Sequence, residues 1–166
     1  MTKQLLTFSI DNNLYAFEVF KVQEVLVYTT PVKIPCASSY IDGLINSRGE
    51  GISVMDLRKK FNLEPQSPTK ETRIIVVEVS RPTAEDPDHI CTFGAVTDSV
   101  QEVLEVEESE IESAPKFGNN IQAEYIRGIT KKDGRFIILL DEERIFAQET
   151  APVTQVQAAA ELNTSE

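Results

Sequence analysis

Residues 40–61, YIDGLINSRGEGISVMDLRKKF, recur in altered form as residues 125–146, YIRGITKKDGRFIILLDEERIF. The two stretches align without a gap at a constant offset of 85 residues. Farther upstream, the sequence VQEVL occurs both at 22–26 and at 100–104, an offset of 78 residues. Because both blocks recur in the same order and at nearly the same spacing, we interpret the chain as two versions of one structural unit.

Segments rich in β-branched and aromatic residues, separated by turn residues, predict five strands in each unit. Asp11-Asn12-Asn13 and Arg48-Gly49-Glu50-Gly51 are typical of tight reversals. Asp56 and Asp141 each precede a short helical turn, which favours an N-cap role for both. The predicted strands are residues 4–10, 14–20, 22–28, 44–47 and 52–55 in the first unit, and 73–79, 90–96, 100–106, 126–130 and 136–140 in the second.

Ten short strands and little helix predict an all-β fold of two five-stranded antiparallel barrels packed together. Residues 73–79 are almost continuously apolar, which predicts a strand covered on both faces where the two lobes meet. The polar, proline-containing residues 64–71 predict a connector, so we place barrel one at about 1–63 and barrel two at about 72–147. Residues 148–166 lack periodicity and predict a disordered tail.

The 166-residue chain is acidic, with a formal net charge of −11, and 41% of its residues are hydrophobic. The lack of clustered Lys and Arg argues against nucleic acid and anionic membranes as partners. Without an apolar run of about 20 residues or a signal peptide, the sequence predicts a cytoplasmic protein that is not inserted in a membrane and binds proteins. Cys36 and Cys91 are then expected to be reduced thiols that act as small apolar side chains.

Catalytic chemistry has little support in a chain with a single histidine. His89 and Cys91 could lie on one strand face with Cys36 as a third ligand, but a zinc site normally needs three or four ligands at paired spacing. No nucleophile or phosphate-binding motif occurs, so we expect no catalytic residue, metal, cofactor or enzyme activity. The equivalent residues Glu24 and Glu102 leave two interpretations open, an ion pair with a nearby base or a binding role.

Several short motifs resemble the CheW family of bacterial chemotaxis coupling proteins: VQEV at 22–25, GLINSRG at 43–49, DLR at 56–58, GAVTDSV at 94–100 and YIRGI at 125–129. The resemblance covers about residues 4–147 and implies one CheW-like domain of two SH3-like barrels packed face to face. It also implies a non-catalytic adaptor that couples the histidine kinase CheA to the cytoplasmic hairpin tips of chemoreceptors. Such a cytoplasmic protein would be recruited to membrane-associated receptor arrays.

Two binding surfaces are implied by this resemblance. The receptor surface would lie between the barrels and include Val22, Glu24, Ile41, Asn46, Arg48, Val96, Asp98 and Val100. The surface for the regulatory domain of the kinase would lie at the apolar end of the first barrel and include Leu14, Leu26, Val27 and Val32. Where the family usually has an apolar residue and then a proline after Arg-Gly, this chain has Gly51 and Ser53, which should leave that strand less stiff.

The repeat itself singles out Arg48. Its equivalent in the second unit is Asp133, and a glycine follows each, so the turn tolerates opposite charges at this position. Arg48 could hold a carboxylate or carbonyl groups of a receptor, or it could only pair with Glu24 inside the barrel. The alternative function is an SH3-like interaction module that serves an unrelated signalling assembly.

Overall fold

The computed structural model describes residues 1–35, 38–113, 123–147 and 149, and these form ten strands and two short α-helices. All ten predicted strands are present, with ends that differ from the prediction by at most three residues, so the all-β fold class is confirmed. Single 3-10 turns are η1 (Val19–Lys21), η2 (Glu108–Glu110) and η3 (Ala123–Tyr125). The other elements are β1 (Thr2–Ile10), β2 (Asn13–Glu18), β3 (Val22–Val27), β4 (Ile41–Ser47), β5 (Glu50–Asp56), α1 (Leu57–Lys60), β6 (Arg73–Ser80), β7 (Ile90–Thr97), β8 (Ser99–Glu107), β9 (Ile126–Lys132), β10 (Arg135–Leu140) and α2 (Glu142–Ile145).

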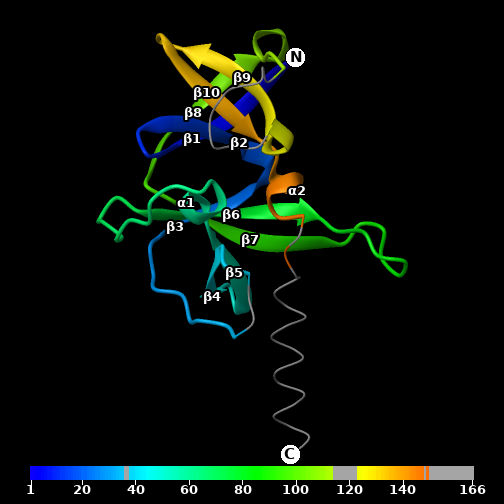
Figure 1. Cartoon of the computed structure of the whole chain (residues 1–166). Coiled ribbons are helices and arrows are strands. Elements are labelled where there is room, and N and C mark those ends of the chain that lie inside the picture. Colours follow the sequence, from blue (N-terminus) through cyan, green and yellow to red (C-terminus); the bar gives the residue numbers. More distant parts are fainter. Residues whose placement is uncertain (36–37, 114–122, 148, 150–166) are drawn as a thin grey trace, which may run out of the picture.

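The strands form two five-stranded sheets, which we call barrel A (order β8-β1-β2-β10-β9) and barrel B (order β3-β6-β7-β5-β4). Figure 1 shows barrel A above barrel B, with α2 beside their junction. Each barrel combines the first two strands of one repeat unit with the last three strands of the other. The expected division into barrel one at 1–63 and barrel two at 72–147 is therefore wrong, because the two units exchange strands.

The links between the second and third strand of each unit explain this exchange. Only η1 separates β2 from β3, and only Asp98 separates β7 from β8. One residue is too short for a hairpin turn, which needs at least two, and Val19-Phe20-Lys21 contains no residue that favours a reversal. The third strand of each unit therefore continues away from its own sheet and joins the other one.

Each barrel is closed by a short segment that follows one of its edge strands. Val32 exchanges two backbone hydrogen bonds of 2.8 Å with Leu44 of β4, and Glu112 does the same with Ile129 of β9. Gly43 has a φ angle of +147°, and a Cβ atom there would overlap the carbonyl oxygen of Val32. Barrel B closes in this way because position 43 has no side chain.

The largest of the three apolar clusters in the described residues joins the two barrels and contains 17 buried side chains. It draws Phe8 and Phe17 from barrel A and Phe93 from barrel B, and the ring of Phe93 stacks on Phe146 with centroids 4.7 Å apart. The prediction for residues 73–79 is confirmed, since β6 is buried on both faces. Burial of apolar surface in this cluster thus stabilises the junction of the two barrels.

Two turns of the repeat have the same backbone shape. Arg48 and Gly49 have φ angles of 54° and 82°, and Asp133 and Gly134 have φ angles of 52° and 80°. Positive φ at both central residues is typical of a two-residue hairpin turn, and the second position favours glycine. Gly51, which we expected in the first of these turns, lies inside β5 instead.

Both predicted N-caps are confirmed. A side-chain oxygen of Asp56 accepts the backbone N–H of Arg58 at 3.0 Å, and Asp141 accepts that of Arg144 at 3.2 Å.

Cys91 is a buried free thiol. Cys36 and the predicted disordered tail at 148–166, apart from residue 149, lie outside the described residues. Within the part of the chain that the structure describes, no helix could cross a membrane.

Candidate functional site

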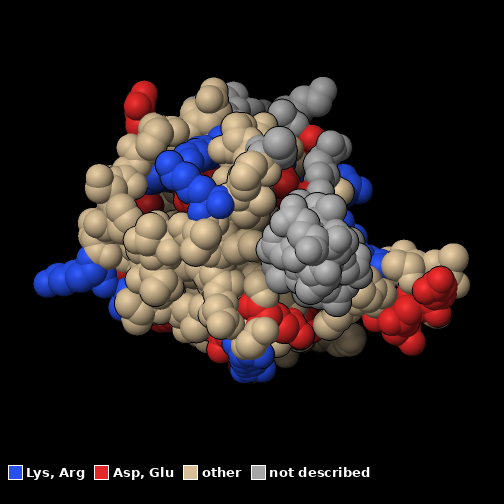
Figure 2. Space-filling view, turned by 90° about the horizontal axis from the view of Figure 1, so that it is seen from below, with Lys and Arg blue, Asp and Glu red and all other residues tan. Residues whose placement is uncertain are grey.

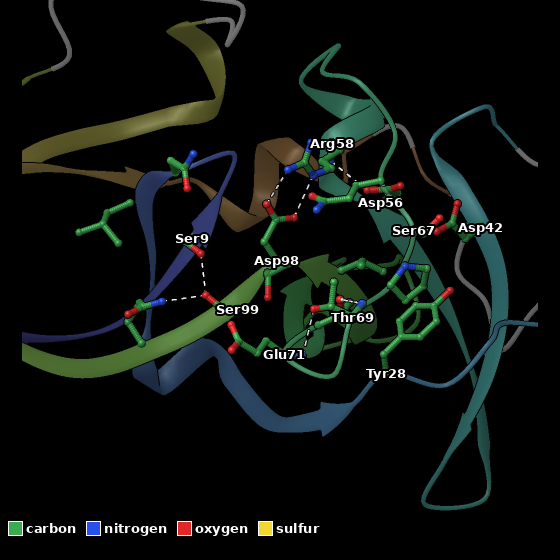
Figure 3. A pocket seen from close by; sticks show the side chains of 18 of the residues that line it. Ser9, Tyr28, Asp42, Asp56, Arg58, Ser67, Thr69, Glu71, Asp98 and Ser99 are labelled. Atoms are coloured by element: carbon green, nitrogen blue, oxygen red, sulfur yellow. Dashed lines mark hydrogen bonds and ion pairs between the residues drawn. The ribbon is translucent and has the colours of Figure 1, made fainter.

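Asp98, the single residue between β7 and β8, belongs to an ion pair that joins the two barrels. The Nε and Nη2 atoms of Arg58 donate hydrogen bonds of 2.9 and 2.6 Å to the two carboxylate oxygens of Asp98 (Figure 3), and the backbone N–H of Asp11 donates one of 2.8 Å to the same carboxylate. Burial alone would raise the pKa of Asp98, but the hydrogen bonds from Arg58 and Asp11 outweigh it and hold this pKa below its ordinary value. We call this set of contacts the α1 clasp.

A groove of about 490 Å³ lies beside the α1 clasp. Burial raises the pKa of Asp56 and also that of Tyr28, and nearby Asp42, which accepts a 2.7 Å hydrogen bond from Lys59, adds to both shifts. Figure 3 shows Tyr28, Asp42 and Asp56 around the opening. Barrel A, barrel B and the connector all contribute to its lining, which includes Ser9, Leu14, Tyr28, Asp42, Asp56, Arg58, Thr69, Val96 and Asp98. The groove is therefore polar and offers both acceptors and donors.

Arg48 lies on the surface of barrel B, at the turn between β4 and β5. Its side chain is 62% exposed, and its Nη2 atom lies 3.7 Å from the carboxylate of Glu24 on β3. Ser47 Oγ donates a hydrogen bond of 2.5 Å to the same carboxylate, so the contact joins the two edge strands of barrel B. Glu24 thus has the basic partner that one interpretation required, while most of the Arg48 guanidinium stays open to solvent.

The eight residues of the predicted receptor surface fall into three groups. Asn46 lies at the same turn as Arg48, where its Oδ1 atom accepts the N–H of Gly49 at 3.1 Å. The first group is Glu24, Asn46 and Arg48 at this turn; the second is Val22, Ile41 and Val100, half-buried against the central cluster; the third is Val96 and Asp98 in the groove. The sequence analysis named Arg58 as part of the DLR motif but not as a site residue, and the structure shows that it binds Asp98 of the third group.

Residues 4–150 match the family model described as a CheW-like domain. The chain belongs to the CheW-like family. It is 30% identical to the chemotaxis protein CheW of Bacillus subtilis over 149 residues, covering 90% of each chain, and 29% identical to that of Klebsiella aerogenes over 147 residues, covering 89% of this chain and 83% of the relative. The crystal structure of the scaffolding protein TtCheW from Thermoanaerobacter tengcongensis is similar with a TM-score of 0.75 and 33% identity, covering 88% of each chain.

Membership of the CheW-like family makes the chain a chemotaxis adaptor, and the family consists of non-enzymatic scaffolds. The fold of two five-stranded sheets matches that of the CheW scaffold structure. Within the described residues, His89 lies near Asp86 (4.0 Å) and Cys91 (3.6 Å), and no three potential metal ligands cluster. The candidate functional sites of this chain are therefore binding surfaces.

The four residues of the predicted kinase surface of this CheW-like chain lie on both barrels. Val27 and Val32 are 71% and 73% exposed, and Leu26 packs half-buried on the interior of barrel B. Leu14 belongs to β2 and therefore to barrel A, so placing it on the same barrel as the others was wrong. The cause is the strand exchange between β2 and β3. Val25, which sequence reasoning missed, is 40% exposed and shares the outer face of β3 with Val27.

The surface around barrel B suits protein contacts in a strongly acidic chain. Figure 2, seen from the barrel B side, shows broad areas without charged side chains between the acidic and basic groups. Exposed apolar residues on one strand, together with Val32, are typical of anchors at protein interfaces.

A buried ionic cluster in barrel A was also missed by sequence reasoning. Glu18 is 2% exposed and accepts hydrogen bonds from Lys3 at 2.5 Å and from Arg127 at 2.7 Å. Glu142 is fully buried, and burial raises its pKa above the ordinary value, despite the nearby guanidinium of Arg127 at 3.4 Å. In the repeat, Arg127 corresponds to Asp42 beside the groove. Nothing in the local sequence marks these charged residues as buried.

Proposed function

We propose that this CheW-like chain binds the regulatory domain of a CheA-type histidine kinase and the cytoplasmic hairpin tip of a chemoreceptor on two separate surfaces. It catalyses no reaction and couples the two partners by holding both at once. The protein works in the cytoplasm and is recruited to membrane-associated receptor arrays through these contacts. The observation that carries the proposal is the match of residues 4–150 to the CheW-like family.

The exposed guanidinium of Arg48 supports a receptor contact at the β4–β5 turn. Asp133 adopts the same backbone conformation in the second unit, so the turn itself does not require arginine. Arg48 has five N–H donors, and its one ionic contact within the described residues is the 3.7 Å approach to Glu24. The remaining donors suit a carboxylate or the carbonyl groups at a helical hairpin tip.

The exposed side chains of Val25, Val27 and Val32 support a separate kinase contact. All three side chains are exposed, whereas Leu26 between the first two points into barrel B. Burying such side chains against a partner gives about 25 cal/mol for each Å² of apolar surface removed from water. Exposed apolar side chains of this kind fit an apolar surface on the regulatory domain of the kinase.

The proposal is tested by assembling a ternary complex. The kinase regulatory domain is immobilised, and a soluble receptor fragment that contains the hairpin tip is added with or without the chain. We expect the receptor fragment to be retained only when the chain is present, because two separate surfaces allow simultaneous binding. Competition between the two partners for the chain, or failure of either to bind it, would contradict the proposal.

A further inference from the structure

The two halves of the chain bind each other across most of the fold. We call residues 1–63 the first half and residues 72–147 the second half. Four strand pairs join them, namely β1 with β8, β2 with β10, β3 with β6 and β5 with β7. The pairs within a half are the hairpins β1–β2, β4–β5, β6–β7 and β9–β10. Neither half therefore contains a complete barrel.

Side-chain contacts join the halves as well. The central cluster combines Phe17 and Met55 of the first half with Ile75 and Phe93 of the second. The α1 clasp joins Arg58 of the first half to Asp98 of the second. Separating the halves would open both barrels and the main apolar core together.

The covalent link between the halves, by contrast, adds little to the fold. Residues 64–71 are all exposed. Within residues 38–113, the hydrogen bonds of this connector are local: Arg58 donates to the carbonyl of Glu64, Arg73 donates to that of Lys70, and Thr69 bonds with Thr72. Among the residues that the structure describes, no disulfide adds a second link, since Cys91 is a free thiol. A change in the path of residues 64–71 would thus disturb few contacts.

We propose that a second copy of this chain can supply either half, which gives a dimer in which the halves are exchanged and residues 64–71 act as the hinge. Each half of such a dimer would complete the barrels of the other chain with the same strand pairs, the same central cluster and the same clasp as in the monomer. Exchange of identical elements is a low-cost route to dimers because it creates no new interface. The dimer presents two copies of every binding surface, which allows bivalent attachment to a partner array.

The first test varies the hinge in the full chain. Deleting Gln66 and Ser67 shortens the connector, so that a chain closes less readily on itself while exchange between chains stays possible. After unfolding in urea and refolding at high protein concentration, light scattering on a sizing column should show a dimer fraction at least about tenfold larger than for the parent chain. The matched control deletes Ala84 and Glu85 from the β6–β7 loop, which connects two strands of the same half.

Equal dimer fractions for the two deletions, or no dimer from either, would overturn the proposal.

The second test distinguishes exchange from surface contact. A protease recognition sequence replaces residues 64–70 without changing the connector length, and the refolded dimer is isolated and cut. An exchanged dimer should separate into monomer-sized particles that each retain both fragments, because only the two hinges link those particles. A dimer that keeps its size after complete cleavage is held by another interface, and the proposal is then wrong.

Discussion

Equivalent helical positions tie the barrels together in both halves of the molecule, but with opposite charge. Arg58 of α1 and Glu143 of α2 are 85 residues apart and correspond in the repeat. Arg58 is only 11% exposed and binds both carboxylate oxygens of Asp98. Glu143 is 32% exposed, accepts a 3.0 Å hydrogen bond from Lys21 and also binds the backbone N–H of Ser80. At this position both halves therefore have a polar contact across the junction of the barrels, whereas the sign of the charge differs.

This comparison separates two kinds of position in the repeat. Some positions that are identical in both halves serve the backbone, as Gly43 and Gly128 do where the barrels close and Asp56 and Asp141 do at the helix starts. At positions that differ in charge, the local partners of the side chain determine the residue type. The differing pairs are Asp42 and Arg127, Arg48 and Asp133, and Arg58 and Glu143.

Replacing the equivalent closure glycines should have the largest effect and should differ between the barrels. Gly43→Ala places a methyl group against the fixed backbone of Val32 at a φ angle of +147°, so we expect a loss of about 3 kcal/mol or more in the free energy of unfolding. Gly128→Ala first meets Cγ2 of Ile111, a side-chain atom that can move, so we expect about 1–2 kcal/mol. Urea unfolding of both variants measures the difference. Equal losses would show that the two closures are mechanically alike.

The α1 clasp and the contacts of Glu143 should also differ in how much they add to the free energy of unfolding. Arg58→Ala leaves the carboxylate of Asp98 without its bidentate partner, and we expect a loss of about 2–3 kcal/mol in the free energy of unfolding. Glu143→Ala removes a more exposed contact and should cost about 1 kcal/mol. Arg144→Ala, in the same helix as Glu143, is the control, since its side chain is 64% exposed and should change stability by less than about 0.5 kcal/mol. A larger loss from Glu143→Ala than from Arg58→Ala would reverse our ranking.

The buried cluster in barrel A predicts a dependence of stability on pH. Burial raises the pKa of Glu142 above its ordinary value of 4.5, so its ionisation disfavours the folded state, and the cost is complete once the pH exceeds the raised pKa. Glu142→Gln cannot ionise. The free energy of unfolding of this variant relative to the parent should therefore increase as the pH rises above about 4.5. A relative stability that is flat or falls with pH between 4 and about 8 would show that Glu142 ionises without cost in the folded protein.

The strands of this fold were predictable because their signals are local. Alternating apolar residues set the strands, and the paired turns at Arg48 and Asp133 set two of the hairpins. The repeat showed which strands of the two units are equivalent. It does not show whether a strand pairs within its own unit or with the equivalent strand of the other unit. The available sign of exchange was the single residue Lys21 between the predicted strands 14–20 and 22–28, because a hairpin turn cannot form there.

The site was less predictable because its contacts cross between the halves. Arg58 and Asp98 are 40 residues apart, and only the strand exchange brings them together. The same exchange moved Leu14 to the other barrel from Leu26 and Val27. Burial of Glu18 and Glu142 likewise results from the packing of α2 and the barrels, and no local pattern reports it.

The central claim of separate partner surfaces is tested most directly by measuring both affinities for two variants. Arg48→Glu should weaken binding of the receptor fragment by about 2 kcal/mol or more, as for a hot-spot arginine, and leave kinase binding unchanged. Val27→Asp should weaken binding of the kinase regulatory domain and leave receptor binding unchanged, since Val27 is 71% exposed and its replacement spares the fold. Asp133→Ala, at the equivalent turn of barrel A, should change neither affinity. The two-surface account is wrong if each variant weakens the binding of both partners equally. It is also wrong if Arg48→Glu lowers the melting temperature while receptor affinity survives.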